Sequence, residues 1–381
     1  MHILLVPDKF KGSLTAKEVI QALQKGISHV SSEFKTSEFV LSDGGDGFLE
    51  AVAQYRDLEE VWVKTVDPLG REMEAPYLFN EKGATAYIEL SKASGMELLK
   101  ITERDALRTS TLGTGIQIRN AIDRGAKHIY IGLGGSATND AGLGIAQALG
   151  FVFKDGTQKK VSPQGGNLNS IKTIERGTIV TEVEKVSFYA INDVNNPLYG
   201  PSGAAYIYAA QKGASPSEIA QLDQGLKDIA ALFSREMKTD YGHLPGAGAA
   251  GGTAYGLKTC FDAQFISGTK FLIHLAGIEV LLKKESIAII ITGEGKIDGQ
   301  TKNGKLVRGM VNLARKHHIP IAAICGKLDL NGKGVAELGL DHVLALQDGT
   351  HSDAYCMTHA SQLIADRVAH FLKENYPNHN Q

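Results

Sequence analysis

The chain has 381 residues, a formal net charge of −2 and 43 glycines. This length allows two domains and a large core. The near-neutral charge, without a long basic run, argues against nucleic acid or an anionic membrane as a partner. No apolar stretch approaches the roughly 18 residues of a membrane span. The first residues, MHILLVPD, lack the basic region and cleavage site of a signal peptide, and three widely spaced cysteines offer no zinc spacing. We therefore expect a cytoplasmic protein.

The N-terminal segment predicts a strand over His2–Val6, followed by PDKFKGSLT and an amphipathic helix that runs to Ile27. Ser13 or Thr15 can cap this helix, and Glu18 stands where a capping box needs it. Lys11 adds positive charge beside the helix start, where an anion could bind. A solvated lysine before an ordinary cap fits the same pattern.

An acidic motif, SDGGDG at residues 42–47, separates a strand predicted at Phe39–Leu41 from a helix predicted at Phe48–Tyr55. Two carboxylates around two glycines suit a metal ion bound to phosphates, or a base beside a metal ligand. The 12-residue pattern of an EF-hand is missing. A turn that caps the helix is the structural alternative. The candidate residues are Asp43, Gly44, Gly45 and Asp46.

Three strands are predicted next, at Val61–Val66, Met73–Leu78 and Thr85–Leu90, with a turn after the first. The β-rich composition here is unlike that of a Rossmann fold. We therefore place a domain boundary near residue 66.

The most informative stretch is Ile129–Gly142, IYIGLGGSATNDAG. An apolar strand breaks on glycines, and helical spacing follows from Leu143. Backbone N–H groups at a helix N-terminus suit phosphate or carboxylate, and glycine permits close approach. A tight turn with an Asn or Asp cap explains the pattern equally well. The candidate binding residues are Gly134, Gly135, Ser136, Thr138 and Asn139.

A strand predicted at Val186–Ile191 ends in NDVNNPL, which places Asp193 among amides that include Asn195. Such a cluster is unusual for a plain turn, although Asn and Asp favour turns. Further on, Gly246–Gly256 superficially resembles a dinucleotide fingerprint. It follows no apolar strand and has no acid at the required distance, so we reject an NAD site. Close helix packing or approach to a nucleotide remain as its roles.

The strongest predicted strand is Ser286–Thr292, which is apolar enough for the centre of a parallel sheet. We expect it to end at Thr292. Glu294, Lys296 and Asp298 then lie among glycines and form a compact set of charges at the strand's carboxyl end, where open α/β sheets bind ligands. The remaining predicted elements are a helix at Lys305–Arg315, strands at Ile319–Cys325 and His342–Leu346, and a helix at Ala354–Leu372.

This order of elements predicts an α/β fold with two domains. The first is a doubly wound parallel-sheet domain, Rossmann- or flavodoxin-like, made of residues 1–65 and 286–381. The second is an inserted α/β domain of residues 66–285 that holds the central glycine loop.

Taken together and in order, five motifs resemble the bacterial glycerate kinase type I family over about residues 1 to 375. They are Pro7–Leu14, Ser42–Gly47, Gly132–Gly142, Asn192–Pro197 and Thr292–Thr301. The family's first motif usually has Ser where this chain has Lys9. The resemblance implies an ATP- and magnesium-dependent kinase of D-glycerate, with two α/β domains around a cleft. It also implies a role in glycerate, glyoxylate or sugar-diacid breakdown and favours 2-phosphoglycerate as the product.

Phosphoryl transfer needs anion cradles, a metal-holding carboxylate and a base near the acceptor hydroxyl. We expect Lys11 and Ser13 to bind an anion, and Asp193 to be the first choice for the base. The predicted catalytic residues are Asp193, Asp46 and Lys11, and the predicted metal ligands are Asp43, Asp193 and Asp298. The predicted binding residues are Ser13, Asp43, Gly44, Gly45, Gly134, Gly135, Ser136, Thr138, Asn139, Asn195, Glu294 and Lys296.

Two other functions stay open at this stage. GLGGSA at residues 132–137 resembles the phosphate loop of galactokinase and homoserine kinase, but the following Thr138–Asp140 departs from that pattern. A glycerate- or nucleotide-binding regulator without activity is the other alternative. The sequence does not decide between a monomer and a homo-oligomer.

Overall fold

The computed structural model describes residues 1–41, 47–177, 183–238, 240–298, 306–330 and 334–377. The chain forms two compact units. The split unit combines Met1–Asp43 with Thr269–Gln381, and the inserted unit is Gly44–Gly268. No helix among the described residues is long and apolar enough to cross a membrane.

The split unit is built on a parallel sheet with the strand order β13-β12-β11-β1-β2. Counted within the unit, this order is 2-1-3-4-5, as in flavodoxin-like folds, which confirms the predicted fold class. The strands are β1 (His2–Pro7), β2 (Lys35–Glu38), β11 (Ile289–Asp298), β12 (Ile321–Asp329) and β13 (His342–Ala345).

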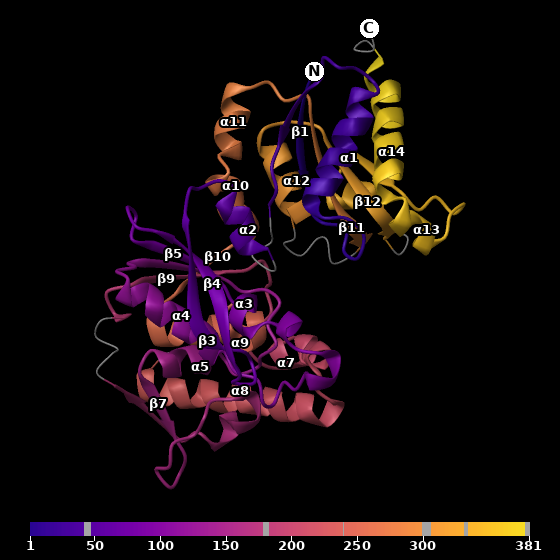
Figure 1. The fold of residues 1–381 in the computed structure, drawn as a ribbon. Helices are drawn as coiled ribbons and strands as arrows, with labels where there is room; N and C mark the ends of the chain where they lie inside the picture. The colour runs from indigo at the N-terminus through magenta and orange to yellow at the C-terminus, as the bar shows by residue number, and fades with distance from the viewer. Residues whose placement is uncertain (42–46, 178–182, 239, 299–305, 331–333, 378–381) are drawn as a thin grey trace. The chain divides into compact units, whose positions relative to one another are not determined.

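Helices cover both faces of this sheet. α1 (Ala16–Ser28) and α14 (Ala360–Asn375) lie side by side and share one core with Ile3, Leu5 and Ile289 (Figure 1). α12 (Leu306–Lys316) contacts β1 and β11 but takes no part in that core, so it packs on the opposite face. The other helices are α10 (Gly268–Leu275), α11 (Ile278–Lys284), the 3-10 helix η6 (Val335–Leu338) and α13 (Asp353–Thr358).

β11 is longer than predicted. It continues through Gly293 to Asp298, paired in parallel with β12 as far as Asp298 opposite Asp329. The expected end of the strand at Thr292 is therefore wrong. Residues two apart in a strand share a face, so the strand itself sets Glu294, Lys296 and Asp298 on one side.

The second strand was also misplaced, because β2 is Lys35–Glu38 and not Phe39–Leu41. β2 is an edge strand that pairs with His2–Leu5 of β1. Its sequence, KTSE, is polar and partly exposed, and an edge strand needs no apolar pattern because only one neighbour pairs with it. The predicted last helix is in fact two helices, α13 and α14, which meet at His359.

The inserted unit has a mixed sheet with the order β10-β9-β6-β5-β4-β3. β4 pairs antiparallel with both β3 and β5, whereas β5, β6, β9 and β10 run parallel to one another. The three strands predicted between residues 61 and 90 are confirmed. The strands are β3 (Glu59–Val66), β4 (Glu72–Asn80), β5 (Thr85–Glu89), β6 (His128–Gly132), β9 (Ser187–Ile191) and β10 (Gln264–Ile266).

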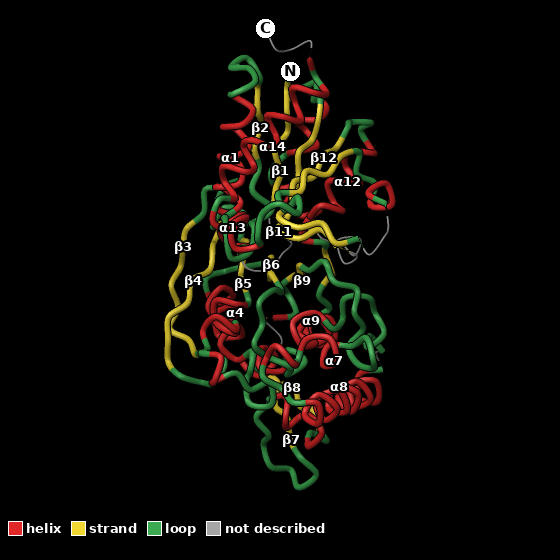
Figure 2. Tube along the Cα trace, turned by 90° about the vertical axis from the view of Figure 1, so that its right-hand side faces the viewer, coloured by secondary structure: helices red, strands yellow, loops and turns green. Residues whose placement is uncertain are grey.

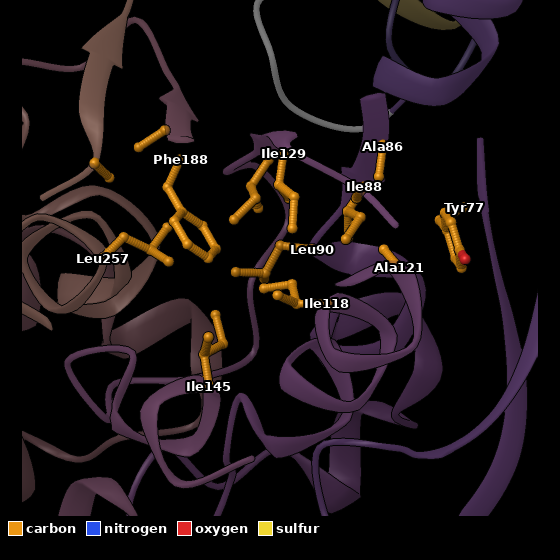
Figure 3. Close-up of a cluster of buried hydrophobic side chains, with 14 of the residues drawn as sticks. Tyr77, Ala86, Ile88, Leu90, Ile118, Ala121, Ile129, Ile145, Phe188 and Leu257 are labelled. Carbon is orange, nitrogen blue, oxygen red and sulfur yellow. The ribbon is translucent and has the colours of Figure 1, made fainter. Parts of the chain in front are cut away.

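One face of this sheet packs against α4 (Leu112–Asp123), α5 (Leu143–Ala148) and α9 (Ala249–Phe261). Figure 3 shows Ile88 and Ile129 of neighbouring strands meeting Ile118 of α4, with Phe188 and Leu257 beside them. Ile88, Ile129 and Phe188 alternate along their strands with residues of the other face. This core holds the strand ends that carry the candidate site.

A second core lies away from the sheet, where α7 (Ala204–Tyr208) and the long α8 (Pro216–Met237) pack with the hairpin of β7 (Phe151–Lys154) and β8 (Thr173–Arg176) (Figure 2). Short elements complete the unit. They are α2 (Phe48–Ala53), α3 (Ser91–Ser94) and the 3-10 helices η1 (Met96–Leu98), η2 (Ile101–Glu103), η3 (Gly165–Ser170) and η4 (Ala210–Lys212).

The units divide at residues other than the expected boundaries near 66 and 285. β3 pairs with β4 from Glu59 to Val66, which joins it to the inserted unit. Thr269 at the start of α10 lies against Gly309 of α12, which joins α10 to the split unit.

Candidate active site

The parallel strands of the inserted unit bring their carboxyl ends to one edge of the sheet, where α/β folds bind ligands. β5 ends there with Glu89, β6 with the glycine loop, and β9 with Asn192 and Asp193. Ser267 follows β10 directly. The structure thus brings together two of the predicted motifs.

Asp193 is held in place by its neighbour. The Ser267 hydroxyl donates a hydrogen bond to Asp193 Oδ1 at 2.5 Å, and the Asn192 amide donates to the Ile266 carbonyl at 3.1 Å. The Asp193 side chain stays partly exposed. A carboxylate that is oriented and still accessible suits a base or a metal ligand.

The amides around Asp193 shape the turn. Asn192 Oδ1 accepts from the Val194 N–H at 3.3 Å, and the Asn196 side chain accepts from the Tyr208 hydroxyl at 2.6 Å. Asn195, a predicted binding residue, is exposed. Asn192 and Asn196 therefore have structural roles, while Asn195 stays accessible to a ligand.

The glycine loop begins as an extension of β6, because the Leu133 amide donates to the Ile191 carbonyl at 3.0 Å. The Gly135 carbonyl then accepts from Met96 N–H at 2.8 Å. Within the described residues, the amides of Gly134, Gly135 and Ser136 donate no hydrogen bond. Gly134 and Gly135 are partly exposed, so these amides can meet an anion.

The helix after the loop does not provide the anion site that the sequence suggested. The fully buried carboxylate of Asp140 already accepts from Gly142 N–H at 3.1 Å and Gly144 N–H at 3.3 Å. It also accepts from the amide and hydroxyl of Thr111 at 2.7 and 2.8 Å. Burial raises the pKa of Asp140, and these hydrogen bonds oppose the rise. The helix end is thus filled by the chain's own anion, and that prediction is wrong.

Thr138 and Asn139, both predicted to bind ligand, are buried. In the described part of the chain, the Thr138 hydroxyl and both polar atoms of the Asn139 amide have no hydrogen-bond partner. The glycine-rich segment packs directly behind them. At Gly251, where φ is +65°, a Cβ would lie 2.0 Å from the Thr138 carbonyl. Close packing is therefore a role of that segment.

The split unit has its own carboxyl edge, and its topological switch point lies between β1 and β11. The Asp8 amide donates to the Gly293 carbonyl at 2.8 Å, and Gly295 packs against the backbone of Phe10 and Lys11. Lys11 is exposed at this point.

The start of α1 is only partly as expected. Thr15 caps the helix and forms the predicted capping box with Glu18. Ser13 instead donates its hydroxyl proton to the Met357 carbonyl at 2.6 Å. This hydrogen bond ties α13 to the loop after β1.

The charges on β11 form an ion-paired group. Lys296 Nζ lies 3.0 Å from Asp329 Oδ2 and 3.5 Å from Asp298 Oδ2. The hydrogen bond that Lys296 donates to Asp329 raises the pKa of Lys296 and lowers the pKa of Asp329. Glu294, two residues earlier on the same face, is 9% exposed. Asp298 thus already has a cationic partner.

The family model described as "Glycerate kinase family" matches residues 3–374. The chain belongs to the glycerate kinase family. It is 36% identical to a protein of Escherichia coli K12 named glycerate 2-kinase, over 93% of each chain. It is 32% identical to a Bacillus subtilis 168 protein named glycerate kinase, over 96% of this chain and 95% of the relative. A solved structure named "Crystal structure of putative glycerate kinase 2 from Salmonella typhimurium LT2" superposes with a TM-score of 0.79 at 34% identity, covering 99% of each chain. The protein is therefore a kinase.

Two buried charges of this glycerate kinase family member escaped the sequence analysis. Glu89 is 1% exposed and accepts from Gly47 N–H at 3.1 Å and Leu49 N–H at 3.0 Å, so it caps α2 from the end of β5. Lys212 is 2% exposed and donates to Ser136 Oγ at 2.8 Å and the Thr138 carbonyl at 2.6 Å. A lysine before a glycine at a helix end looks like an ordinary surface residue, and nothing nearby signals its burial.

The predicted metal ligands of this kinase belong to different parts of the chain. Asp193 is in the inserted unit and Asp298 in the split unit. Asp43, Gly44, Gly45 and Asp46 lie outside the described residues. Across the described ranges, no group of three or more His, Cys, Asp and Glu could hold a metal ion. Mg²⁺ usually takes only one or two protein carboxylates beside substrate phosphates, and Asp193 is a carboxylate of that kind.

Proposed function

We propose that this kinase transfers the γ-phosphoryl group of ATP to D-glycerate and forms 2-phosphoglycerate. Family membership and the relative named glycerate 2-kinase support the reaction. The observation that carries it in this chain is the accessible carboxylate of Asp193, fixed by Ser267 at the same sheet edge as the open amides of the glycine loop. The cellular role we propose is glycerate, glyoxylate or sugar-diacid catabolism in the cytoplasm.

In this proposal the hydroxyl oxygen of glycerate bonds to the γ-phosphorus of ATP, and Asp193 accepts the hydroxyl proton. The bond between that phosphorus and the ADP oxygen breaks, and ADP leaves. Ser267 donates to Asp193 Oδ1 and so fixes the direction of the carboxylate. The amides of Gly134, Gly135 and Ser136 bind an anionic group of a ligand.

The other roles are proposed from the sequence. Lys11, Ser13, Glu294 and Lys296 bind ligand at the split unit's edge, and Asn195 and the buried Thr138 and Asn139 do so in the inserted unit. Asp46 assists catalysis, and Gly44 and Gly45 approach the phosphates. Mg²⁺, when bound, would neutralise charge on the phosphates. Asp43, Asp193 and Asp298 are its proposed ligands.

A coupled ADP-release assay with D-glycerate tests the reaction, and phosphorus NMR of the product separates the 2-phosphate from the 3-phosphate. ADP formation without glycerate is the background control. Turnover of homoserine or galactose but not of glycerate would favour the small-molecule kinase alternative. Calorimetric binding of glycerate without ADP release would favour a regulator.

A further inference from the structure

Lys212 reaches its buried position through a sharp turn at the end of η4. Gly213, with φ at +95°, follows it, and a Cβ there would lie 2.1 Å from the Arg104 carbonyl. The Gly213 amide donates back to the Ala210 carbonyl at 3.1 Å. A side chain at residue 213 would clash with the Arg104 backbone, so only glycine fits this turn. A lysine buried in this way is costly unless its ammonium group is hydrogen-bonded.

The ammonium group fixes which way its hydrogen bonds run. Lysine in this form only donates, so Ser136 Oγ and the Thr138 carbonyl both accept from Lys212. Ser136 must therefore send its own hydroxyl proton elsewhere. Within the described ranges of the chain, no hydrogen bond donated by the Ser136 hydroxyl is present. The neighbouring Gly134 and Gly135 are partly exposed, which gives a ligand a path to this loop.

We propose that Lys212 is a positioning residue whose ammonium group sets the Ser136 hydroxyl as a hydrogen-bond donor to an anionic oxygen of a ligand. That oxygen belongs either to the carboxylate of glycerate or to a phosphate of ATP. The inference rests on the proposed function, because it concerns the same glycine loop. Lys212 itself is buried behind the loop and acts through Ser136.

Charge balance at the loop supports this arrangement. Asp140 holds the far end of the loop, and its negative charge favours the charged form of Lys212. Arg104, on the segment against which the turn packs, donates to the Gln211 carbonyl at 3.4 Å. Lys212 thus holds the loop at Ser136 and Thr138, and the carboxylate of Asp140 holds the residues that follow.

The proton on Lys212 gives the proposal a pH signature. Burial lowers the pKa of Lys212 to about 7, against the opposing effect of Asp140. A neutral amine has a lone pair, so after deprotonation Ser136 can donate inward to Lys212. The outward hydrogen bond to the ligand is then lost.

A double-mutant cycle on the full-length protein tests the proposal. The variants are Ser136→Ala, Lys212→Met and the double variant, with Lys227→Met on the exposed side of α8 as the matched control. The measured quantities are the KM values for D-glycerate and for ATP. A lost hydrogen bond to a charged group corresponds to about a tenfold change or more.

We expect Ser136→Ala to raise KM for one ligand about tenfold, and Lys212→Met to raise KM for the same ligand. The double variant should be no worse than the more affected single variant, and the control should match wild type. The ligand whose KM rises identifies the anionic group. Effects that multiply, or that fall on different ligands, would overturn the inference.

If Lys212→Met does not fold by circular dichroism, pH profiles of wild type and Ser136→Ala replace the cycle. From about pH 6 to about pH 8.5, the wild-type KM should rise and that of Ser136→Ala should stay level. Parallel profiles would contradict the role of Lys212. If wild type releases no ADP with glycerate, the proposed function fails by itself. Calorimetry of ATP and D-glycerate binding to wild type and Ser136→Ala then decides, and equal affinities for both ligands reject the inference.

Discussion

The two units end their parallel strands in polar edges, but they hold their charges in different ways. At the inserted unit's edge, Glu89, Asp140 and Lys212 are buried and tied to backbone or hydroxyl groups. At the split unit's edge, Lys11 and Lys296 are exposed, and Lys296 pairs with carboxylates on β11 and β12. Buried hydrogen bonds fix the charges of the first edge, whereas solvent screens Lys11 and the ion pairs of Lys296 at the second.

This difference has energetic consequences. Buried polar networks are costly to leave half-satisfied, whereas exposed ion pairs contribute little to stability. Substitutions at the inserted edge should therefore alter folding, rate or both. Substitutions at the split edge should alter ligand affinity and leave folding unchanged. The following predictions test that contrast.

The largest expected effect is on the proposed base. Asp193→Asn should lower kcat by about 10²- to 10⁴-fold, because an amide cannot accept the hydroxyl proton. The fold should survive, since Asp193 is only partly buried. Steady-state ADP release and the thermal midpoint measure the two quantities. Ser267→Ala should lower kcat less, since it removes only the group that orients Asp193. Near-normal turnover of Asp193→Asn would remove this residue from the base role.

The next effect compares carboxylates of the two edges. Asp140→Asn should lower the free energy of unfolding by about 2 to 4 kcal/mol, because the new NH₂ group faces N–H donors of Thr111 or Gly144. Asp329→Asn, which disrupts the exposed pair with Lys296, should leave unfolding unchanged. Urea titrations of both variants measure this. Equal losses in the two variants would show that the edges do not differ in this way.

Lysines of the two edges should differ in how they couple folding to pH. The pKa of Lys212 is lowered to about 7 in the folded chain, from its ordinary value of 10.5. Above pH 7 the unfolded chain therefore binds more protons at this site, and stability rises with pH. From pH 7 to 9 the gain is about 2 kcal/mol.

Urea titrations at both pH values measure this gain, and Lys212→Met should lack it. Lys296 provides the contrast, because its pKa is raised and it stays protonated in both states over this range. Lys296→Met should keep the wild-type slope. A Lys212→Met variant with that same slope would exclude Lys212 as its source.

The contrast between the edges also explains what the sequence could predict. β1 and the start of β11 were predicted because long apolar runs mark strands buried on both faces, and β6 and β9 carry shorter apolar runs. Their carboxyl ends then located Asp193 and the glycine loop. The capping box of Thr15 and Glu18 was equally visible, since it depends on residues three apart.

The remaining features depend on tertiary contacts. Pairing with β12 extends β11 to Asp298, although the sequence predicted that the strand ends at Thr292. Asp140 looked like a cap, and only its contact with Thr111 shows that it fills the helix end. Lys212 is separated from Ser136 by 76 positions, so no local pattern links them. Asp329 lies beside Lys296 only because of the register in which β12 pairs with β11.

The smallest expected effect is on Lys296, and it tests the split edge alone. Lys296→Met should raise KM for ATP by about threefold to tenfold, because an exposed cation contributes modestly to phosphate binding. The increase should shrink in added salt, since screening weakens the wild-type interaction as well. Exposed Lys327, the neighbour of Lys296 across the β11–β12 pairing, is the matched control. An effect on kcat that persists in salt would mean that Lys296 is part of a fixed framework like that of the inserted edge.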